Sequence, residues 1–352
     1  MRRLENSAKS ELKPDKTEIV FLPYKAAMWD SLESVWLSAA EDPQCDVYVI
    51  PIPYYDKNPD DGALGQMHYD GDQYPDYVPV VDWRSYDFET RRPDIIYVHN
   101  PYDEYNYSTS VHPDFYSKRL KEFTEMLVYI PYFVCVEDGM DKDLCVLPGV
   151  LYADRVIVQS EEVRQMYICE FKNAEEAFDC AGQFGNAEEK FVALGSPKLD
   201  KVFSTKPEDC KIPDEWRKLI GLTDGARKKV ILYNTTLMSI LAEDEKYLKK
   251  IRSVLEYFRG DDKVVLLWRP HPLSESTYQS MRPQFLEEYE SIVSEYRRQG
   301  FGIYDDTPDV HRAIAVSDAY YGDGSSLVAL FELTGKPVMI QNIEMISNKT
   351  FP

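Results

Sequence analysis

Residues 317–342 read SDAYYGDGSSLVALFELTGKPVMIQN and predict a strand, a turn, a helix and a second strand in close succession. The first strand is expected over 318–322, the turn at 323–324, the helix over 325–335 and the second strand over 337–341. A glycine in the turn lets the backbone bend tightly, and a serine at the start of the helix satisfies its first free amides. These residues therefore predict a helix N-terminus at the carboxyl end of a strand, a position that favours binding of a phosphate group.

A second polar cluster follows another expected strand. Residues 264–273 read VVLLWRPHPL and place Arg269 and His271 at the end of that strand. Because the carboxyl ends of parallel strands lie at one edge of a sheet, both clusters would face one ligand if the sheet is parallel. Helix capping would explain the serines alone, but together with Arg269 and His271 they favour phosphate binding. The predicted phosphate-binding residues are Arg269, His271, Asp323, Gly324, Ser325 and Ser326.

These motifs resemble those of the CDP-glycerol glycerophosphotransferases, the teichoic-acid polymerase family. RPHPL at 269–273, DGSS at 323–326 and GKPV at 335–338 are similar to an Arg-x-His-Pro element and an Asp-x-Ser-Ser element followed by Lys-Pro. The resemblance is clear over about residues 229–342. It implies a transferase of teichoic-acid biosynthesis that moves a polyol phosphate from a CDP-activated donor to a cell-wall polymer or glycan acceptor. These elements would bind the diphosphate of the donor.

Alternation of strands and helices along the chain favours an α/β fold with parallel sheets. The resemblance implies two Rossmann-like domains that face each other across a cleft, a GT-B-like architecture. We expect an N-terminal acceptor domain over 1–203, a linker over 204–226 and a C-terminal nucleotide-binding domain over 227–352. This architecture usually adds a closing helix after the last strand, so we expect either that this helix is missing or that the chain is trimmed.

Size and charge restrict the function further. A chain of 352 residues with 44% hydrophobic residues is long enough for two folded domains. Its net charge of -21 opposes binding to nucleic acid or to an anionic membrane. Residues 1–16 lack the apolar stretch of a signal peptide, and the longest apolar run, 126–136, is too short to span a bilayer. We expect a cytoplasmic protein with at most peripheral contact at the inner face of the cell membrane.

The general base has two candidates. The resemblance implies a His-Gly-x-Pro element after a strand of the first half, and residues 136–140, VEDGM, place Asp138 where that histidine would stand. A carboxylate can act as a base when burial raises its pKa. His99, at the end of the strand expected over 94–100, is the alternative.

Two further predicted ligand contacts each have an alternative interpretation. Glu332 lies two turns after Ser325 on the same predicted helix face and could accept the ribose hydroxyls, although the family has its acidic residue where this chain has Leu330. A solvated surface glutamate fits equally well. Residues 54–76 are expected to form a long loop whose tyrosines could bind a sugar or polyol chain, and a plain surface excursion is the simpler interpretation.

Other classes of function are compatible with the same phosphate contacts. One is a nucleotide-sugar glycosyltransferase or epimerase of GT-B fold, and another is a non-catalytic relative that binds the nucleotide. An NAD enzyme is disfavoured because residues 22–28, LPYKAAM, lack the glycine-rich fingerprint after the first strand. We expect no cofactor and no metal, since no His/Cys cluster occurs. The expected partners are a CDP-activated polyol or nucleotide-sugar donor and a glycan or polyol-phosphate acceptor, without nucleic acid.

Overall fold

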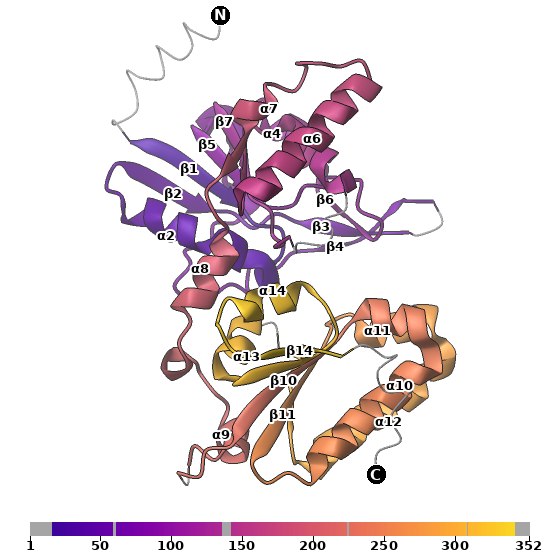
Figure 1. The fold of residues 1–352 in the computed structure, drawn as a ribbon. Helices are drawn as coiled ribbons and strands as arrows, with labels where there is room; N and C mark the ends of the chain where they lie inside the picture. The colour runs from indigo at the N-terminus through magenta and orange to yellow at the C-terminus, as the bar shows by residue number, and fades with distance from the viewer. Residues whose placement is uncertain (1–15, 59–60, 136–141, 224, 308, 342–352) are drawn as a thin grey trace, which may run out of the picture. The chain divides into compact units, whose positions relative to one another are not determined.

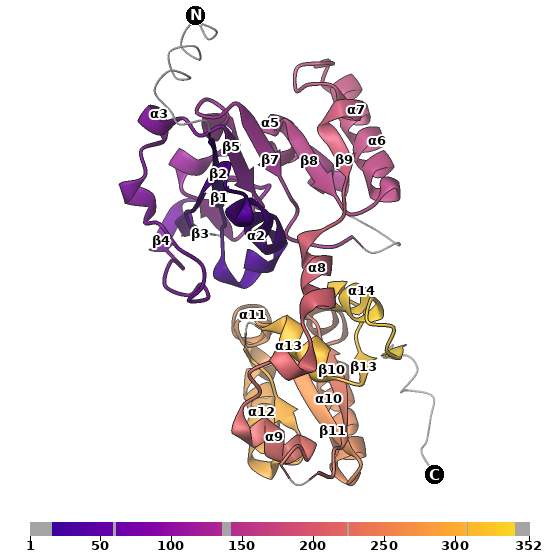
Figure 2. The same cartoon turned by 90° about the vertical axis from the view of Figure 1, so that its left-hand side faces the viewer.

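The computed structural model describes residues 16–58, 61–135, 142–223, 225–307 and 309–341. The chain divides into two compact units, Met1–Asp200 and Lys201–Pro352, and each contains its own parallel β-sheet (Figures 1 and 2). The predicted α/β fold with parallel sheets is confirmed.

The first unit is built on a six-stranded sheet in which every strand pair is parallel. In spatial order the strands are β2 (Cys45–Val49), β1 (Thr17–Leu22), β5 (Ile95–Val98), β7 (Met126–Tyr129), β8 (Arg155–Val158) and β9 (Phe191–Ala193). β2 lies on one side of β1 and the remaining strands continue on the other side, so the strand order reverses between β1 and β5. In open α/β sheets, ligands bind beside such a reversal, at the carboxyl ends of the strands.

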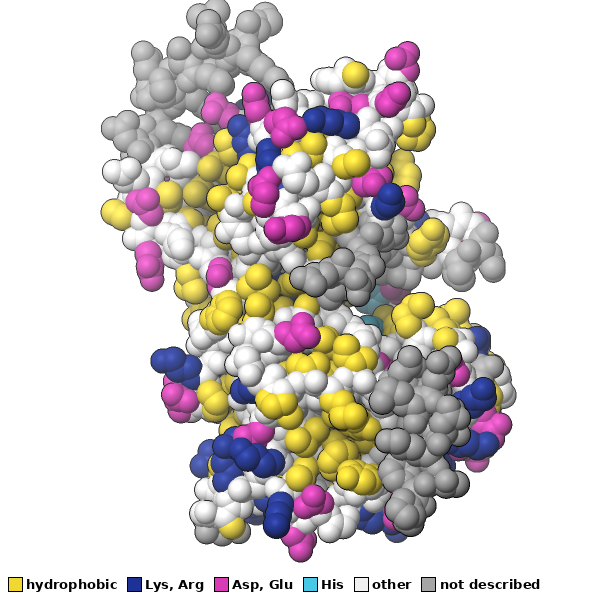
Figure 3. Space-filling view, viewed as in Figure 1, with side chains coloured by type: hydrophobic (Ala, Val, Ile, Leu, Met, Phe, Trp, Pro, Cys, Tyr) yellow, Lys and Arg dark blue, Asp and Glu magenta, His cyan; other side chains and the backbone are white. Residues whose placement is uncertain are grey.

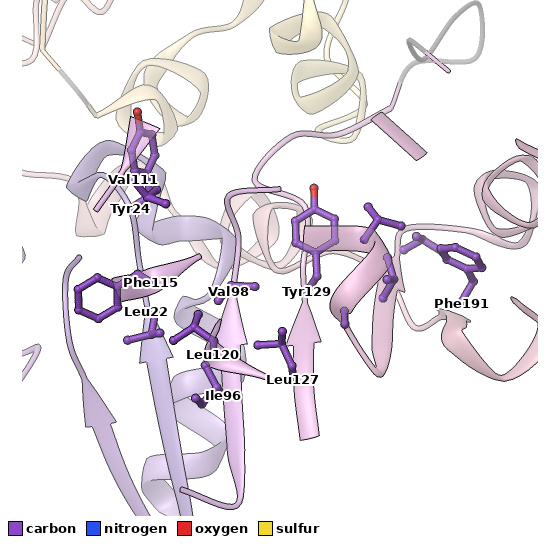
Figure 4. Packing of buried hydrophobic residues seen from close by; sticks show 14 of the residues in the cluster. Leu22, Tyr24, Ile96, Val98, Val111, Phe115, Leu120, Leu127, Tyr129 and Phe191 are labelled. Carbon is purple, nitrogen blue, oxygen red and sulfur yellow. The ribbon is translucent and has the colours of Figure 1, made fainter. Parts of the chain in front are cut away.

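Both faces of this sheet are buried, which explains the nearly continuous apolar sequence of its strands. Side chains alternate along β1: Val20 and Leu22 belong to one core, whereas Ile19 and Phe21 belong to the core on the opposite face. Figure 4 shows Leu22 in the first of these cores, beside residues of the neighbouring strands. The helices of the unit are η1 (Ala26–Ser31), α2 (Glu33–Glu41), η2 (Trp83–Ser85), α3 (Phe88–Arg91), η3 (Pro113–Phe115), α4 (Ser117–Leu120), η4 (Lys142–Val146), α5 (Pro148–Tyr152), α6 (Glu161–Ala177) and α7 (Ala187–Lys190).

A second, small sheet corrects one prediction. Within the residues expected to form a long loop, β3 (Tyr54–Lys57) and β4 (Leu64–His68) pair antiparallel, and β6 (Thr109–Val111) joins them (Figure 1). The loop prediction over 54–76 is therefore wrong in part. Its local composition does favour turns, but pairing with a strand far along the chain outweighs that preference.

The second unit contains a five-stranded parallel sheet. Its spatial order is β12 (Ile303–Tyr304), β11 (Val264–Pro270), β10 (Lys229–Thr235), β13 (Ala319–Gly322) and β14 (Val338–Ile340). The chain runs outward from β10 to β12 and then returns to the other side of β10. The strand order of this unit therefore reverses between β10 and β13. The predicted phosphate-binding turn at 323–324 directly follows β13.

Helices follow the strands of this unit as the alternation predicts. They are α9 (Asp214–Ile220), α10 (Leu237–Arg259), α11 (Ser274–Met281), α12 (Leu286–Gln299), α13 (Val310–Val316) and α14 (Ser326–Glu332), with the short helices η5 (Pro207–Asp209) and η6 (Pro283–Phe285). The segment 204–226 contains η5 and α9, and Trp216 and Ile220 of α9 are buried. Helix α8 (Pro197–Ser204) crosses the boundary between the units. Within the described ranges, no helix is both long and apolar enough to cross a membrane.

Candidate functional site

The carboxyl ends of β10 and β13 meet at the reversal in the second unit. Their register pairs Asn234 with Gly322, and a Cβ atom on Gly322 would lie 2.3 Å from the Asn234 carbonyl oxygen. Gly322 also has a φ of 149°, so both the close approach and the backbone conformation require glycine. The sequence predicted instead that Gly324 allows the tight turn after this strand. Gly324 is exposed and does not have a positive φ, so that part of the prediction is wrong.

Asp323 is buried and its carboxylate is used inside the protein. Its Oδ2 accepts hydrogen bonds from the Thr236 backbone N–H (2.9 Å) and from the Tyr247 hydroxyl, and its Oδ1 accepts from Lys250 Nζ (2.5 Å). Lys250 also donates to the Gln341 carbonyl at 3.1 Å. An anion held in this way ties the turn after β13 to α10, and it would repel a phosphate rather than bind it. The structure therefore gives Asp323 a positioning role in place of the expected phosphate contact.

The two serines have different environments. Ser325 caps α14: its Oγ accepts from the Leu327 N–H at 3.2 Å and lies 3.1 Å from Asn234 Oδ1, to which it donates. Ser326 is exposed, and its hydroxyl has no hydrogen-bond partner in the part of the chain that the structure describes. Ser326 is thus the serine whose hydroxyl is available to a ligand, whereas the Leu327 and Val328 amides of the first turn donate to Ser325.

Arg269 does not present its guanidinium as the sequence suggested. The side chain is buried, forms an ion pair with the fully buried carboxylate of Asp305 and donates to the Thr307 carbonyl at 2.8 Å. These contacts connect the end of β11 to the segment that follows β12. Both partners of such a buried ion pair are needed, because either charge alone would be costly to bury. Arg269 therefore organises the strand ends, and it also lines the pocket beside His271.

His271 does present a donor. Its backbone N–H donates to the Thr235 carbonyl at 2.9 Å, and its Nδ1 accepts from the Leu273 N–H at 3.1 Å. An imidazole that accepts at Nδ1 carries its proton on Nε2, and burial lowers the pKa of His271. The neutral ring thus keeps an Nε2–H for which the described residues provide no acceptor. His271 also lines a pocket of about 470 Å³ together with Ser274 and Arg297, a volume in the range of small-ligand sites.

Asn234 connects the two motifs and was missed by the sequence analysis. Its Oδ1 accepts from Ser325, and its Nδ2 donates to the Arg269 carbonyl at 2.9 Å. The sequence does carry a signal for this residue, because the polar residues Asn-Thr-Thr at 234–236 stand at and just beyond the end of a mainly apolar central strand. The residue predicted to contact the ribose lies on α14. Glu332 is exposed at the last residue of α14, whereas Leu330 points into the core.

In the first unit, His99 is fully buried at the end of β5. Its Nε2 accepts from the Tyr24 N–H at 2.6 Å, so its proton lies on Nδ1, 2.7 Å from the Ser31 hydroxyl. Ser31 in turn donates to the Met28 carbonyl at 2.7 Å. Burial lowers the pKa of His99 to about 3. With both nitrogens engaged and no solvent access, His99 is a structural residue and lacks the free nitrogen that a general base needs.

The other candidate base, Asp138, lies outside the described residues. Among the residues that are described, no group of three or more His, Cys, Asp or Glu side chains is arranged to hold a metal ion.

Two units that are each built on a parallel sheet, with polar loops at the carboxyl ends of the strands, are typical of the GT-B fold. Solved structures agree. A UDP-N-acetylglucosamine 2-epimerase matches with a TM-score of 0.53 at 13% identity, covering 94% of this chain and 79% of the epimerase. The wall teichoic acid polymerase TagF matches with a TM-score of 0.52 at 15% identity, covering 96% of this chain and 72% of the polymerase. The UDP-GlcNAc 2-epimerase from Methanocaldococcus jannaschii matches with a TM-score of 0.53 at 9% identity, covering 94% and 87%.

At such low identities these likenesses define the fold alone. The family comes from the sequence: residues 152–347, more than half of the chain, match the CDP-glycerol:poly(glycerophosphate) glycerophosphotransferase family, and the chain belongs to that family. The protein is therefore a transferase, as the resemblance implied. No curated protein sequence matches this chain.

Proposed function

We propose that the second unit, expected as a nucleotide-binding domain over 227–352, binds a CDP-activated polyol at the reversal between β10 and β13. The observation that carries this proposal is the position of Asn234, which is hydrogen-bonded to both predicted phosphate-binding elements, through Ser325 Oγ at 3.1 Å and the Arg269 carbonyl at 2.9 Å. One side chain thereby fixes the spacing between the two elements that the family uses for the diphosphate.

Binding must come from local donors. The chain carries a net charge of -21, and on the face shown in Figure 3 basic side chains are interspersed with acidic ones. Long-range attraction of an anionic donor is therefore not expected. His271 Nε2–H and the Ser326 hydroxyl are the groups that support a diphosphate here. Preorganised donors of this kind also stabilise the charge that develops on the leaving nucleotide.

The reaction is a phosphoryl transfer. A hydroxyl oxygen of the acceptor attacks the phosphorus that carries the polyol, a new phosphodiester bond forms, and the anhydride bond to CMP breaks. The hydroxyl proton passes to a general base and CMP leaves with the electron pair of the broken bond. Asp138 is the candidate base by its position after β7, while the environment of His99 supports a structural role.

Nucleotide selectivity and turnover test this function. Thermal shift measurements with CDP, CTP, UDP, GDP and NAD should show the largest stabilisation with the cytidine nucleotides. Incubation with CDP-glycerol and a synthetic oligo(glycerol phosphate) should release CMP and lengthen the oligomer. Equal or larger stabilisation by UDP, together with no CMP release, would instead favour a nucleotide-sugar enzyme of the same fold.

A further inference from the structure

The first unit has its own strand-order reversal, between β1 and β5. The loops after these two strands are joined by the hydrogen bond from the Tyr24 N–H to His99 Nε2 at 2.6 Å. Lys25 is the next residue along the chain and precedes η1 (Ala26–Ser31). It therefore lies at the place where ligands of open α/β sheets bind.

Lys25 is a cation without an acceptor. Its side chain is half-buried, and Nζ lies 5.2 Å from the ring centroid of Tyr24 and 4.8 Å from that of Tyr54. The described residues provide neither an ion-pair partner nor a hydrogen-bond acceptor for Nζ. Partly buried lysines normally find such a partner, because an ammonium group loses hydration when it is buried. The two rings compensate in part through cation–π contacts, and they hold Nζ in place with its N–H groups unused.

The carboxylates of Asp70 and Asp56 act electrostatically on this ammonium group, and they differ in their own hydrogen bonds. Asp56 is paired with His68 at 2.7 Å. Asp70 accepts only long hydrogen bonds, from the Ala26 N–H at 3.3 Å and from the Tyr54 hydroxyl at 3.4 Å. Because a carboxylate has about four acceptor positions, Asp70 can accept further hydrogen bonds from a ligand.

These groups suit a ligand that carries an anionic phosphodiester next to neutral hydroxyls. Lys25 alone would favour any anion, but Asp70 repels a ligand that carries only negative charge. A neutral sugar would use Asp70 and the tyrosine rings, yet it would leave the Lys25 ammonium without an acceptor. A polyol phosphate satisfies both, since its phosphodiester accepts from Lys25 and its hydroxyls donate to Asp70.

We propose that Lys25, Tyr54 and Asp70 form the binding site for the polyol-phosphate end of the acceptor chain. The choice of ligand rests on the proposed function, whereas the site itself is defined by the unpartnered lysine at the reversal of the first unit. Lys25 Nζ donates to a phosphodiester oxygen, Tyr54 packs beside the carbon chain, and Asp70 accepts from a terminal hydroxyl. Binding to this site is independent of the nucleotide.

Titration calorimetry with synthetic hexa(glycerol phosphate) tests this site on the full chain. Lys25→Met should weaken binding about tenfold or more, because it removes a charge-assisted hydrogen bond and keeps the length of the side chain. Lys25→Arg should recover part of the affinity. Lys118→Met is the matched control, because Lys118 is an exposed lysine of α4 and its loss changes the net charge equally. CDP affinity should be the same in all four proteins.

A second measurement does not depend on the variants folding. Binding of hexa(glycerol phosphate) to the wild type should weaken as the salt concentration rises, and free glycerol should not compete. If wild type binds CDP but not the oligomer, or if Lys25→Met and Lys118→Met bind the oligomer equally well, the acceptor site is refuted and the nucleotide site stands. If the oligomer binds in a Lys25-dependent manner and CDP does not bind, the acceptor site stands and the proposed nucleotide site fails.

Discussion

Lys250 Nζ lies 2.5 Å from Asp323 Oδ1, and the two side chains are only 2% and 4% exposed. This ion pair joins α10 to the turn that precedes α14, so the position of the candidate phosphate site depends on a residue that is far from it in sequence. Lys250 Nζ also donates a hydrogen bond to the carbonyl of Gln341, which follows β14. Desolvation makes such a pair costly to break, because removing one partner leaves the other as an uncompensated buried charge.

Lys250→Met should therefore destabilise the protein by about 3–5 kcal/mol. Urea denaturation of the variant measures the change in the free energy of unfolding. Lys249→Met is the control, since Lys249 is exposed and, among the described residues, its ion pair is the i,i+4 pair with Glu245. Its loss should change stability by less than about 0.5 kcal/mol. Equal stability of the two variants would contradict the role of the ion pair.

His271→Ala should weaken binding of CDP-glycerol roughly tenfold to a hundredfold, the usual effect of losing one charge-assisted hydrogen bond. The protein should stay folded, because the ring is half-buried and its only hydrogen bond within the described residues is to the Leu273 N–H. Titration calorimetry of wild type and variant measures the difference. His112→Ala, a change in the other unit, should leave the affinity unchanged; unchanged affinity in the His271 variant would remove the phosphate site.

The affinity for CDP-glycerol should not rise between pH 8 and pH 7, a range that lies above the ordinary pKa of histidine. Burial lowers the pKa of His271 below its ordinary value of 6.5, and protonation of Nδ1 would also break the hydrogen bond from Leu273. The ring is therefore mainly neutral across this range and donates through Nε2–H. The diphosphate diester of CDP-glycerol does not titrate there, so a clear increase in affinity on acidification would mean that His271 binds as a cation.

The two serines of the turn should respond in opposite ways. Ser325→Ala removes a helix cap and should lower the free energy of unfolding by about 1 kcal/mol. Ser326→Ala should leave stability unchanged and weaken CDP-glycerol binding, because the Ser326 hydroxyl is exposed and free to contact a ligand. Thermal denaturation and calorimetry on both variants separate the effects. A loss of affinity confined to Ser325→Ala would reverse the assignment.

Asp138→Asn should abolish CMP release while CDP-glycerol still binds, the signature of a residue that acts only in the chemical step. His99→Ala should instead lower stability by about 1–3 kcal/mol, because it leaves the buried Tyr24 N–H without an acceptor. Turnover rates, binding and denaturation of both variants decide between the roles. A folded His99 variant that binds the donor but has lost turnover would restore His99 as the base.

Local sequence was enough to predict the elements that carry the site. The apolar run of β11, the serine that caps α14 and the glycine-containing turn between β13 and α14 each follow from residues close together in the chain. The position of His271 one residue beyond β11 was predictable for the same reason. Backbone preference and capping are short-range effects, so the pattern within a few residues determines them.

The roles of several side chains were decided only by the tertiary structure. Arg269 and Asp323 were read as ligand contacts because their charge and place suit a phosphate, yet Asp305 and Lys250 neutralise them in the folded protein. Similarly, Gly322 rather than Gly324 is required because Asn234 of a neighbouring strand approaches it.

Long-range contacts likewise decide which groups remain available. His99 is inaccessible because Tyr24 and Ser31 occupy both of its nitrogens, and Lys25 is held between two tyrosine rings because β3 pairs with a strand far along the chain. A sequence determines which residues can carry a charge or a hydrogen bond. Folding determines which of these residues still have a charge or a hydrogen-bonding group available for a ligand, because polar groups that are buried together pair with one another.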